Sequence, residues 1–204
     1  KSPHMGSLRQ LSLHAALDAP AELSALADSA LLDGLEGLSL DSNTLTPAAW
    51  GPVLRSPQAA SLTSLSAQLC RLTTTAALRP LAQSDHLASL ETLRLRGNAF
   101  GVAGARTLAA SNSFDRLKRL SLPVCALGDA GASALLEAPW LNTVEELDLS
   151  FNRLTSATLK ALIGSPHLGS LKRLLLRGNP LGDAERVCDM LLEHFERPLD
   201  VDFA

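Results

Sequence analysis

The sequence predicts an α/β fold in which short strands and helices alternate along one repetitive domain. Within each repeat, apolar residues first alternate with polar ones, as in a strand with one buried face. They then recur three and four residues apart, which is typical of a helix. The pattern returns every 27 or 28 residues, with repeats that begin at Leu35, Leu62, Leu90, Leu117, Val144 and Leu171.

The repeat can be followed towards both ends of the chain. Leu8, Leu11 and Leu13 match the strand of a degenerate first repeat, while Val201 and Phe203 match a final strand. We therefore expect one domain over residues 8–204, with about seven repeats and a strand stub near residues 201–203. Repeat starts are expected near residues 8, 35, 62, 90, 117, 144 and 171. The first residues, KSPHMGS (1–7), look like an expression scar and carry no fold prediction.

Each position in the repeat has a structural role. Strand residues such as Leu93 and Leu95 are expected to point into the core. The side chain at the following turn is expected to hydrogen-bond the loop backbone, because polar groups buried in a turn must be paired. The residues at this turn position are Asn43, Cys70, Asn98, Cys125, Asn152 and Asn179.

The second half of each repeat is predicted to be helical. Asp129, Ser156 and Asp183 lie near the expected helix starts. Short polar side chains at such positions cap the free backbone N–H groups of the first turn. We therefore expect each of these residues to cap its own helix.

The L-x-x-L-x-L-x-x-N/C spacing resembles the leucine-rich repeats of the ribonuclease-inhibitor class. That class alternates strand and helix and mixes Asn with Cys at the turn. The resemblance covers nearly the whole chain and implies a horseshoe-shaped solenoid, with a concave parallel sheet and convex helices. It also implies that a protein partner binds on the concave side or along its rim. The motif is specific for fold and weak for function.

Composition narrows the class of protein further. Of the 204 residues, 46% are hydrophobic and only 3% aromatic, so the core is expected to be mainly stacked leucine. The net charge of −3 and the lack of a basic, aromatic-rich stripe argue against nucleic-acid binding. No apolar run approaches the roughly 18 residues that a membrane span requires.

The cysteines predict free thiols rather than a disulfide framework. Cys70 and Cys125 lie two repeats apart, or about 10 Å in a parallel sheet, which is too far for a disulfide. Buried free thiols suit a reducing compartment, so a cytoplasmic location is expected. The abundance of Arg and Ala favours a bacterial source.

Charged residues on the exposed sheet face have two interpretations. The charge alternates in sign along Arg119, Glu146, Arg173 and Asp200, one residue per repeat, and also along the neighbouring Glu91, Lys118, Glu145 and Lys172. Such residues can form a ladder of surface ion pairs, which contribute about 0–1 kcal/mol each. Alternatively, they contact a partner.

Residues that such a ladder leaves over are the better candidates for binding. Arg94, Arg96 and Arg177 have no acidic neighbour in their rows, and Leu175 replaces a polar residue. Leu69, Val124 and Phe151 lie at the strand exit and are expected to be partly exposed; Val124 and Phe151 either pack over the turn or contact a partner. Arginine and aromatic residues are favoured at binding hot spots. The candidate partner-binding surface consists of Arg94, Arg96, Arg119, Val124, Asp148, Phe151, Leu175 and Arg177.

Catalytic and metal-binding patterns are not evident in the sequence. His86 and His167 occupy equivalent positions three repeats apart, about 15 Å, too far to share a metal ion. No serine lies in a G-x-S-x-G setting, and no glycine-rich phosphate loop occurs. We therefore expect no enzymatic activity, no cofactor and no metal.

The sequence favours a protein-interaction module that is monomeric or weakly self-associating, binds no nucleic acid and does not insert into membranes. Two alternatives stay open. By analogy, the chain could regulate a small GTPase in the manner of an activating protein, offering a rim arginine or asparagine to its partner. It could also be the recognition domain of a larger receptor or bacterial effector.

Overall fold

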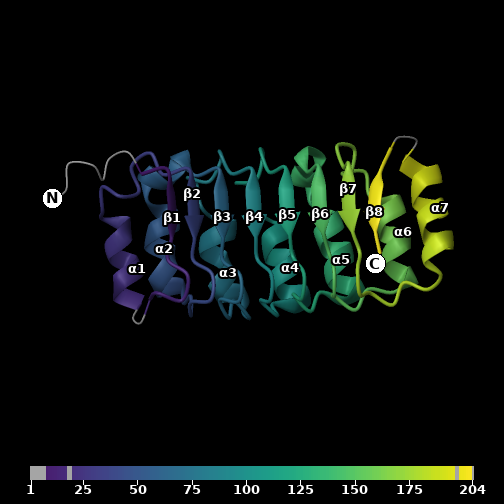
Figure 1. The fold of residues 1–204 in the computed structure, drawn as a ribbon, viewed down its shortest axis with the longest axis horizontal. Helices are drawn as coiled ribbons and strands as arrows, with labels where there is room; N and C mark the ends of the chain where they lie inside the picture. The colour runs from purple at the N-terminus through teal and green to yellow at the C-terminus, as the bar shows by residue number, and fades with distance from the viewer. Residues whose placement is uncertain (1–7, 18–19, 196–197, 204) are drawn as a thin grey trace.

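The computed structural model describes residues 8–17, 20–195 and 198–203. The expected scar at residues 1–7 lies outside the described residues, as does Ala204. Strands and helices alternate along the chain, and the strands stand side by side in chain order with helices behind them (Figure 1). The predicted α/β architecture is confirmed.

The strands are all short. They are β1 (Gln10–Ser12), β2 (Gly37–Ser39), β3 (Ser64–Ser66), β4 (Thr92–Arg94), β5 (Arg119–Ser121), β6 (Glu146–Asp148), β7 (Arg173–Leu175) and β8 (Asp200–Asp202). The helices are α1 (Pro20–Ala27), α2 (Pro47–Arg55), α3 (Thr75–Ala82), α4 (Gly101–Ala109), α5 (Gly128–Leu136), α6 (Ser156–Gly164) and α7 (Ala184–Phe195). Two 3-10 helices follow α2 and α5, namely η2 (Pro57–Ser61) and η3 (Pro139–Thr143).

Neighbouring strands pair in parallel, in the order β1 to β8 across the described residues. The central residue of each strand aligns with that of the next, as Leu93 does with Leu120, and both are buried. The first residues of the strands form row one and the last residues form row two. These rows lie on the open face, the sheet face away from the helices. The register matches the one that the leucine spacing predicts.

The core lies between sheet and helices and is mainly leucine. Tryptophans fill its helical side. Trp50 is fully buried and donates its Nε1–H to Ala77 O at 3.0 Å. Trp140 packs edge-on against Phe114, with ring centroids 5.2 Å apart, and donates to Ala109 O at 3.2 Å. Every buried side-chain polar atom within the described residues has a hydrogen-bond partner.

From the second repeat to the seventh, the side chain at the turn position joins each turn to the preceding repeat. Asn98 Nδ2 donates to Ala67 O at 2.7 Å and to Leu95 O at 2.9 Å. Its Oδ1 accepts from Cys70 N at 2.9 Å and Leu72 N at 3.1 Å. The side chain therefore satisfies backbone groups of two repeats at once.

The same bridge recurs with asparagine or cysteine. Asn43, Asn152 and Asn179 donate to the carbonyls of Leu13, Leu122 and Leu149 in the preceding repeats. Cys70 Sγ donates to Leu40 O at 3.1 Å and Cys125 Sγ to Leu95 O at 3.3 Å. A thiol can therefore replace the amide donor. It lacks the amide oxygen that accepts from the backbone, and at the Cys70 turn the Cys70 carbonyl accepts from Leu45 N instead.

The helix starts differ in part from the sequence prediction. Asp183 accepts from Glu185 N at 3.0 Å and Arg186 N at 3.3 Å, which is the expected cap. Ser156 is not a cap, because Thr155 precedes the helix and accepts from Ala157 N at 3.3 Å. Asp129 does not cap α5, whose N-cap is Leu127.

Asp129 instead accepts hydrogen bonds from the next repeat. Its carboxylate accepts from Thr155 N at 2.8 Å, from Thr155 Oγ1 at 2.7 Å and from the Thr158 hydroxyl. Desolvation raises the pKa of Asp129, but the hydrogen bonds from Thr158 and Thr155 outweigh it, so the pKa lies below its ordinary value. The prediction was wrong for Asp129 because its carboxylate bonds the start of α6, in the next repeat, and not the start of its own helix α5.

Candidate functional site

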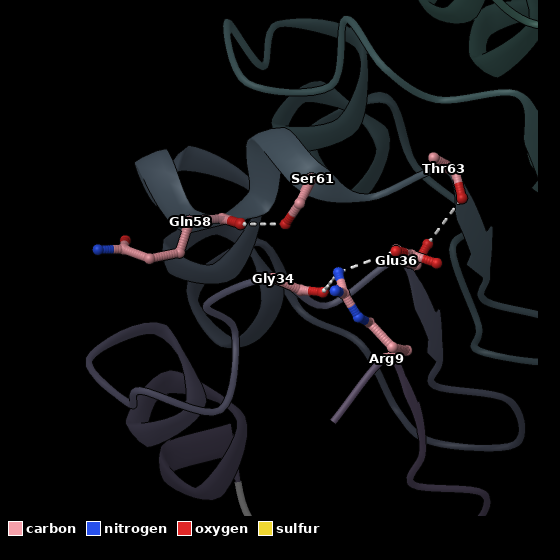
Figure 2. Close-up of polar contacts among 6 residues, drawn as sticks. All are labelled: Arg9, Gly34, Glu36, Gln58, Ser61 and Thr63. Carbon is pink, nitrogen blue, oxygen red and sulfur yellow. Dashed lines mark hydrogen bonds and ion pairs between the residues drawn. The ribbon is translucent and has the colours of Figure 1, made fainter. Parts of the chain in front are cut away.

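The two edges of the sheet carry charge differently. We call the residues directly before the strands the entry edge. There Arg9 pairs with Glu36 at 2.9 Å and also donates to Gly34 O at 3.4 Å, while Thr63 Oγ1 donates to Glu36 O (Figure 2). Further along, Lys118 pairs with Glu91 at 3.1 Å and Lys172 with Glu145 at 2.8 Å. The entry edge therefore neutralises its own charges.

The predicted ladder in row one is present only in part. Arg173 Nε lies 3.0 Å from Asp200 Oδ2. Arg119 Nε donates to Thr92 Oγ1 at 3.1 Å rather than to Glu146, which has no ion pair within the described residues. Row one therefore holds separate contacts, and the guanidinium of Arg119 remains exposed on the open face.

The other predicted site residues occupy rows two and three. Row three lies two positions beyond the end of each strand. Arg94 and Leu175 lie in row two with Asp148, while Arg96 and Arg177 lie in row three. Arg94, Arg96 and Arg177 are exposed, and their guanidinium groups have no hydrogen bond or ion pair with any residue that the structure describes.

Two further arginines share this setting, and the sequence analysis did not select them. Arg71 and Arg153 lie between the turn Cys or Asn and the apolar residue that closes the turn. Both are exposed, and neither guanidinium has a partner in the described part of the chain. We call the residues between each strand and the following helix the exit edge. It includes row three as well as Arg71 and Arg153. The sequence signal that could have identified them is the triplets CRL and NRL, in which arginine directly follows the buried turn residue.

Bulky apolar residues stand on the exit edge in an unfavourable backbone conformation. Leu69, Val124 and Phe151 have φ of +55°, +59° and +55°. Their exposed fractions are 57%, 43% and 47%. The equivalent residues of other repeats are Gly97 and Gly178, which adopt this left-handed conformation readily. A side chain with a Cβ in this region costs on the order of 1 kcal/mol or more.

The two glycines also give room to their apolar neighbours. A Cβ at Gly97 would collide with the side chain of Leu69, and one at Gly178 would collide with the ring of Phe151. Each apolar side chain therefore lies over the glycine of the following repeat. Packing over the turn, the alternative interpretation for Phe151, is present, yet about half of that side chain remains exposed.

Two acidic side chains nearby, Asp148 and Asp41, already accept hydrogen bonds from within the chain. Asp148 accepts from Ser121 Oγ at 3.2 Å and Ser150 N at 3.0 Å. Asp41 accepts from Ser66 Oγ and Gln68 N, each at 2.7 Å. The arginines and the exposed apolar residues therefore share a surface on which these carboxylates are used internally.

A shallow polar hollow of about 420 Å³ opens on the N-terminal half of the open face. The sequence analysis did not predict it. It is lined mainly by hydroxyl and amide side chains, and its charged lining residues are Asp41 and Arg94.

The thiols in the turns are unsuited to nucleophilic chemistry. Burial raises the pKa of the Cys70 thiol to about 11 and that of Cys125 to about 12. Both cysteines are free and act as hydrogen-bond donors. In the described residues no three His, Cys, Asp or Glu side chains gather in a way that could hold a metal ion. Among the same residues, no helix is long and apolar enough to cross a membrane.

Comparisons with known proteins agree with this geometry. A family model described as a leucine-rich repeat matches residues 86–109 and 141–162. No curated protein matches the sequence. The crystal structure of an internalin (InlF) from Listeria monocytogenes matches with a TM-score of 0.57 and 23% sequence identity, covering 89% of this chain and 44% of the internalin. This chain thus spans less than half the length of that structure.

The fold is therefore a leucine-rich repeat solenoid, with a parallel sheet on one side and helices on the other. At this sequence identity the likeness to the internalin concerns the fold alone. The likeness therefore carries no information about the exposed side chains of the open face and exit edge.

Proposed function

We propose that this protein is a binding module for a protein partner, which it holds against the open face and exit edge of its sheet. Leucine-rich repeat domains generally mediate protein–protein interaction. The observation that carries the proposal is the set of exposed arginines that have no hydrogen-bond or ion-pair partner in the described residues, beside apolar side chains that are about half exposed. Arginine and aromatic residues dominate binding hot spots, and an unpaired guanidinium can bind a carboxylate through two parallel hydrogen bonds.

A comparison of two charge-reversed forms in affinity capture from source lysate tests this proposal. In one form Arg94, Arg96 and Arg177 become Glu; in the control, Lys118 and Lys172 on the entry edge become Glu. All these side chains are exposed, so both variants are expected to fold. We expect a protein that the parent chain and the control retain and the first variant loses. Equal retention by all three forms would contradict the open face and exit edge as the binding surface.

The finer assignments of the sequence analysis are kept as part of the proposal. The ribonuclease-inhibitor class is supported by a helix in every full repeat and by Asn and Cys sharing one turn position. A reducing, cytoplasmic location is supported by the free, buried Cys70 and Cys125. A bacterial source is supported by composition.

Regulation of a small GTPase is a second candidate function. Exposed arginines on the exit edge, such as Arg71 and Arg153, are the observation that favours it. An arginine supplied to a partner's nucleotide site can accelerate hydrolysis by about 10³–10⁵-fold. GTP hydrolysis by candidate partners, measured with the parent chain and with Arg71→Ala and Arg153→Ala, separates this function from simple binding. Unchanged hydrolysis with every candidate partner would count against it.

A further inference from the structure

The exit edge contains the same four-residue arrangement twice. Anchor unit 1 consists of Leu69, Arg71, Arg96 and Gly97. Anchor unit 2 consists of Phe151, Arg153, Arg177 and Gly178. In each unit a bulky apolar residue and the arginine two positions later both have left-handed backbones, at +55° and +57° in unit 1 and +55° and +59° in unit 2.

The two units are also held together in the same way. Leu69 N donates to Arg96 O at 2.8 Å, and Phe151 N donates to Arg177 O at 2.7 Å. The apolar side chain lies over the glycine that follows this second arginine. Each unit therefore combines one half-exposed apolar side chain with two arginines whose guanidinium groups have no partner in the described residues.

The units lie three repeats apart, which corresponds to about 15 Å across a parallel sheet. Val124 stands between them, 43% exposed and also left-handed. The edge thus offers two cationic, apolar sites with an apolar residue between them. A ligand that contacts both must run across the strands, along the exit edge.

Deepening the proposed function, on which this inference rests, we infer that the partner contributes an acidic segment with two apolar residues, one for each anchor unit. Carboxylates satisfy the free arginines, whose planar groups suit two-point hydrogen bonding. Apolar side chains of the segment cover Leu69 and Phe151. An extended segment spans about 15 Å with four or five residues and a helix with about ten.

An acidic protein segment fits this surface better than a nucleic acid or an anionic membrane. Nucleic-acid binders usually carry a basic domain, whereas this chain has a net charge of −3. The apolar members of the units are an aliphatic residue and a single ring lying over glycine, rather than a run of aromatic platforms for bases. The positive charge is local, and each part of it stands beside an apolar side chain.

Selection from a random 16-residue peptide library, displayed on phage, tests the inference with the full chain as bait. We expect selected peptides to contain acidic residues around two apolar positions, separated by four or five residues or by about ten. Synthetic copies should lose roughly tenfold or more in affinity when Arg71 and Arg96 become Glu, or when Arg153 and Arg177 become Glu. Combining the two changes should abolish binding.

The matched control is charge reversal of Arg79 and Arg106, which are exposed on α3 and α4 away from the exit edge. It should leave affinity unchanged. A second set of variants removes the apolar side chains through Leu69→Gly and Phe151→Gly. Glycine tolerates a left-handed backbone, so these variants should unfold at the same or a higher temperature while binding the peptide more weakly. Ala126→Gly, at an exposed left-handed position without a bulky side chain, should leave binding unchanged.

The outcomes separate this inference from the proposed function. Selected peptides without acidic residues, or affinities that survive reversal of both units, overturn the anchor units. If Arg94→Glu or Arg119→Glu nevertheless abolishes binding of the selected peptides, the open face remains supported as the binding surface although the anchor units do not. If only the variant with Arg79 and Arg106 reversed loses binding, the open face is contradicted as the binding surface as well. Failure to select acidic peptides, together with unit-dependent binding of a single-stranded oligonucleotide or anionic phospholipid vesicles, overturns the protein partner itself.

Discussion

The two edges of this sheet are made by the same repeat, yet they treat charge in opposite ways. On the entry edge, Glu36, Glu91 and Glu145 each have a basic partner within 3.1 Å. On the exit edge, Arg96 and Arg177 have no partner among the described residues, while Asp183 bonds the start of α7 and Asp129, in the first turn of α5, bonds the start of α6. The charged groups of the entry edge therefore form ion pairs with each other, whereas these exit-edge arginines form none with the described residues.

The edges also differ in how the backbone is held. Exposed side chains join neighbouring repeats at the entry edge, with Lys172 and Glu145 67% and 41% exposed. At the exit edge buried turn residues join them, and Asn98 and Asn152 are fully buried. A rigid, buried support beneath the exit edge can hold exposed groups in strained conformations, as a binding surface requires. The buried hydrogen bonds between repeats and the unpaired exposed arginines are therefore found on the same edge.

The largest expected effect comes from removing that buried support. Asn98→Ala leaves Cys70 N, Leu72 N and Ala67 O without their partner, while Leu95 O keeps Cys125 Sγ as a donor. Unsatisfied buried groups cost about 1–3 kcal/mol each, so we expect a loss of at least about 3 kcal/mol in urea unfolding. Asn112→Ala, at an exposed position, serves as the control.

A cysteine at position 98 sharpens the same test. Cys70 and Cys125 show that a thiol can donate to the preceding repeat but cannot accept two backbone N–H groups. Asn98→Cys should therefore restore part of the stability that Asn98→Ala loses. If the two variants were equally unstable, the interpretation of cysteine as a working substitute at this turn would be wrong.

An intermediate effect is expected at Asp129, whose pKa is lowered by hydrogen bonds from Thr158 and Thr155 against the opposing effect of desolvation. A carboxyl whose folded pKa lies below the unfolded value of 3.8 stabilises the fold fully above that value. The contribution is lost as the pH falls through the folded pKa. After discounting for solvent exposure, Asp129→Asn should cost about 0.5 kcal/mol at neutral pH.

Thermal unfolding of the parent and Asp129→Asn between pH 7 and pH 3 measures this contribution. The difference between them should be constant at the upper end and shrink below about pH 4, where the parent carboxyl begins to protonate. Asp115→Asn, at an exposed carboxyl without a hydrogen bond in the described part of the chain, controls for net charge. Parallel curves at every pH would show that Asp129 does not hold the start of α6 through its charge.

The leucine spacing was sufficient to predict the strands, their register and the exposed rows. Shifting a strand by one residue would turn residues such as Leu93 and Leu120 out of the core, so burial fixes the register strongly. The turn position was predictable for the same reason. A buried asparagine or cysteine must find a backbone partner, and the repeat brings the same carbonyl beside it each time.

The features that the sequence analysis missed depend on choices between neighbours. Arg119 could pair with Glu146, yet it bonds Thr92 on the other side. Asp129 bonds Thr155, which lies in the next repeat and outside the span in which a cap is normally sought. The left-handed backbone of Leu69 and Phe151 could not be predicted from propensity, which favours glycine there. Only aligning these residues with Gly97 and Gly178, their equivalents in other repeats, would have suggested it.

The smallest expected effect tests the entry edge. The hydrogen bond from Lys172 is the main cause that lowers the pKa of Glu145 below its ordinary value. Lys172→Ala should therefore raise the Glu145 pKa towards that value, measured by NMR titration of its side chain. Because both groups are exposed, the unfolding midpoint should not change beyond error, and added salt should reduce the pKa difference between parent and variant. A clear loss of stability would mean that the entry edge also holds the repeats together, and the contrast between the two edges would then rest on binding alone.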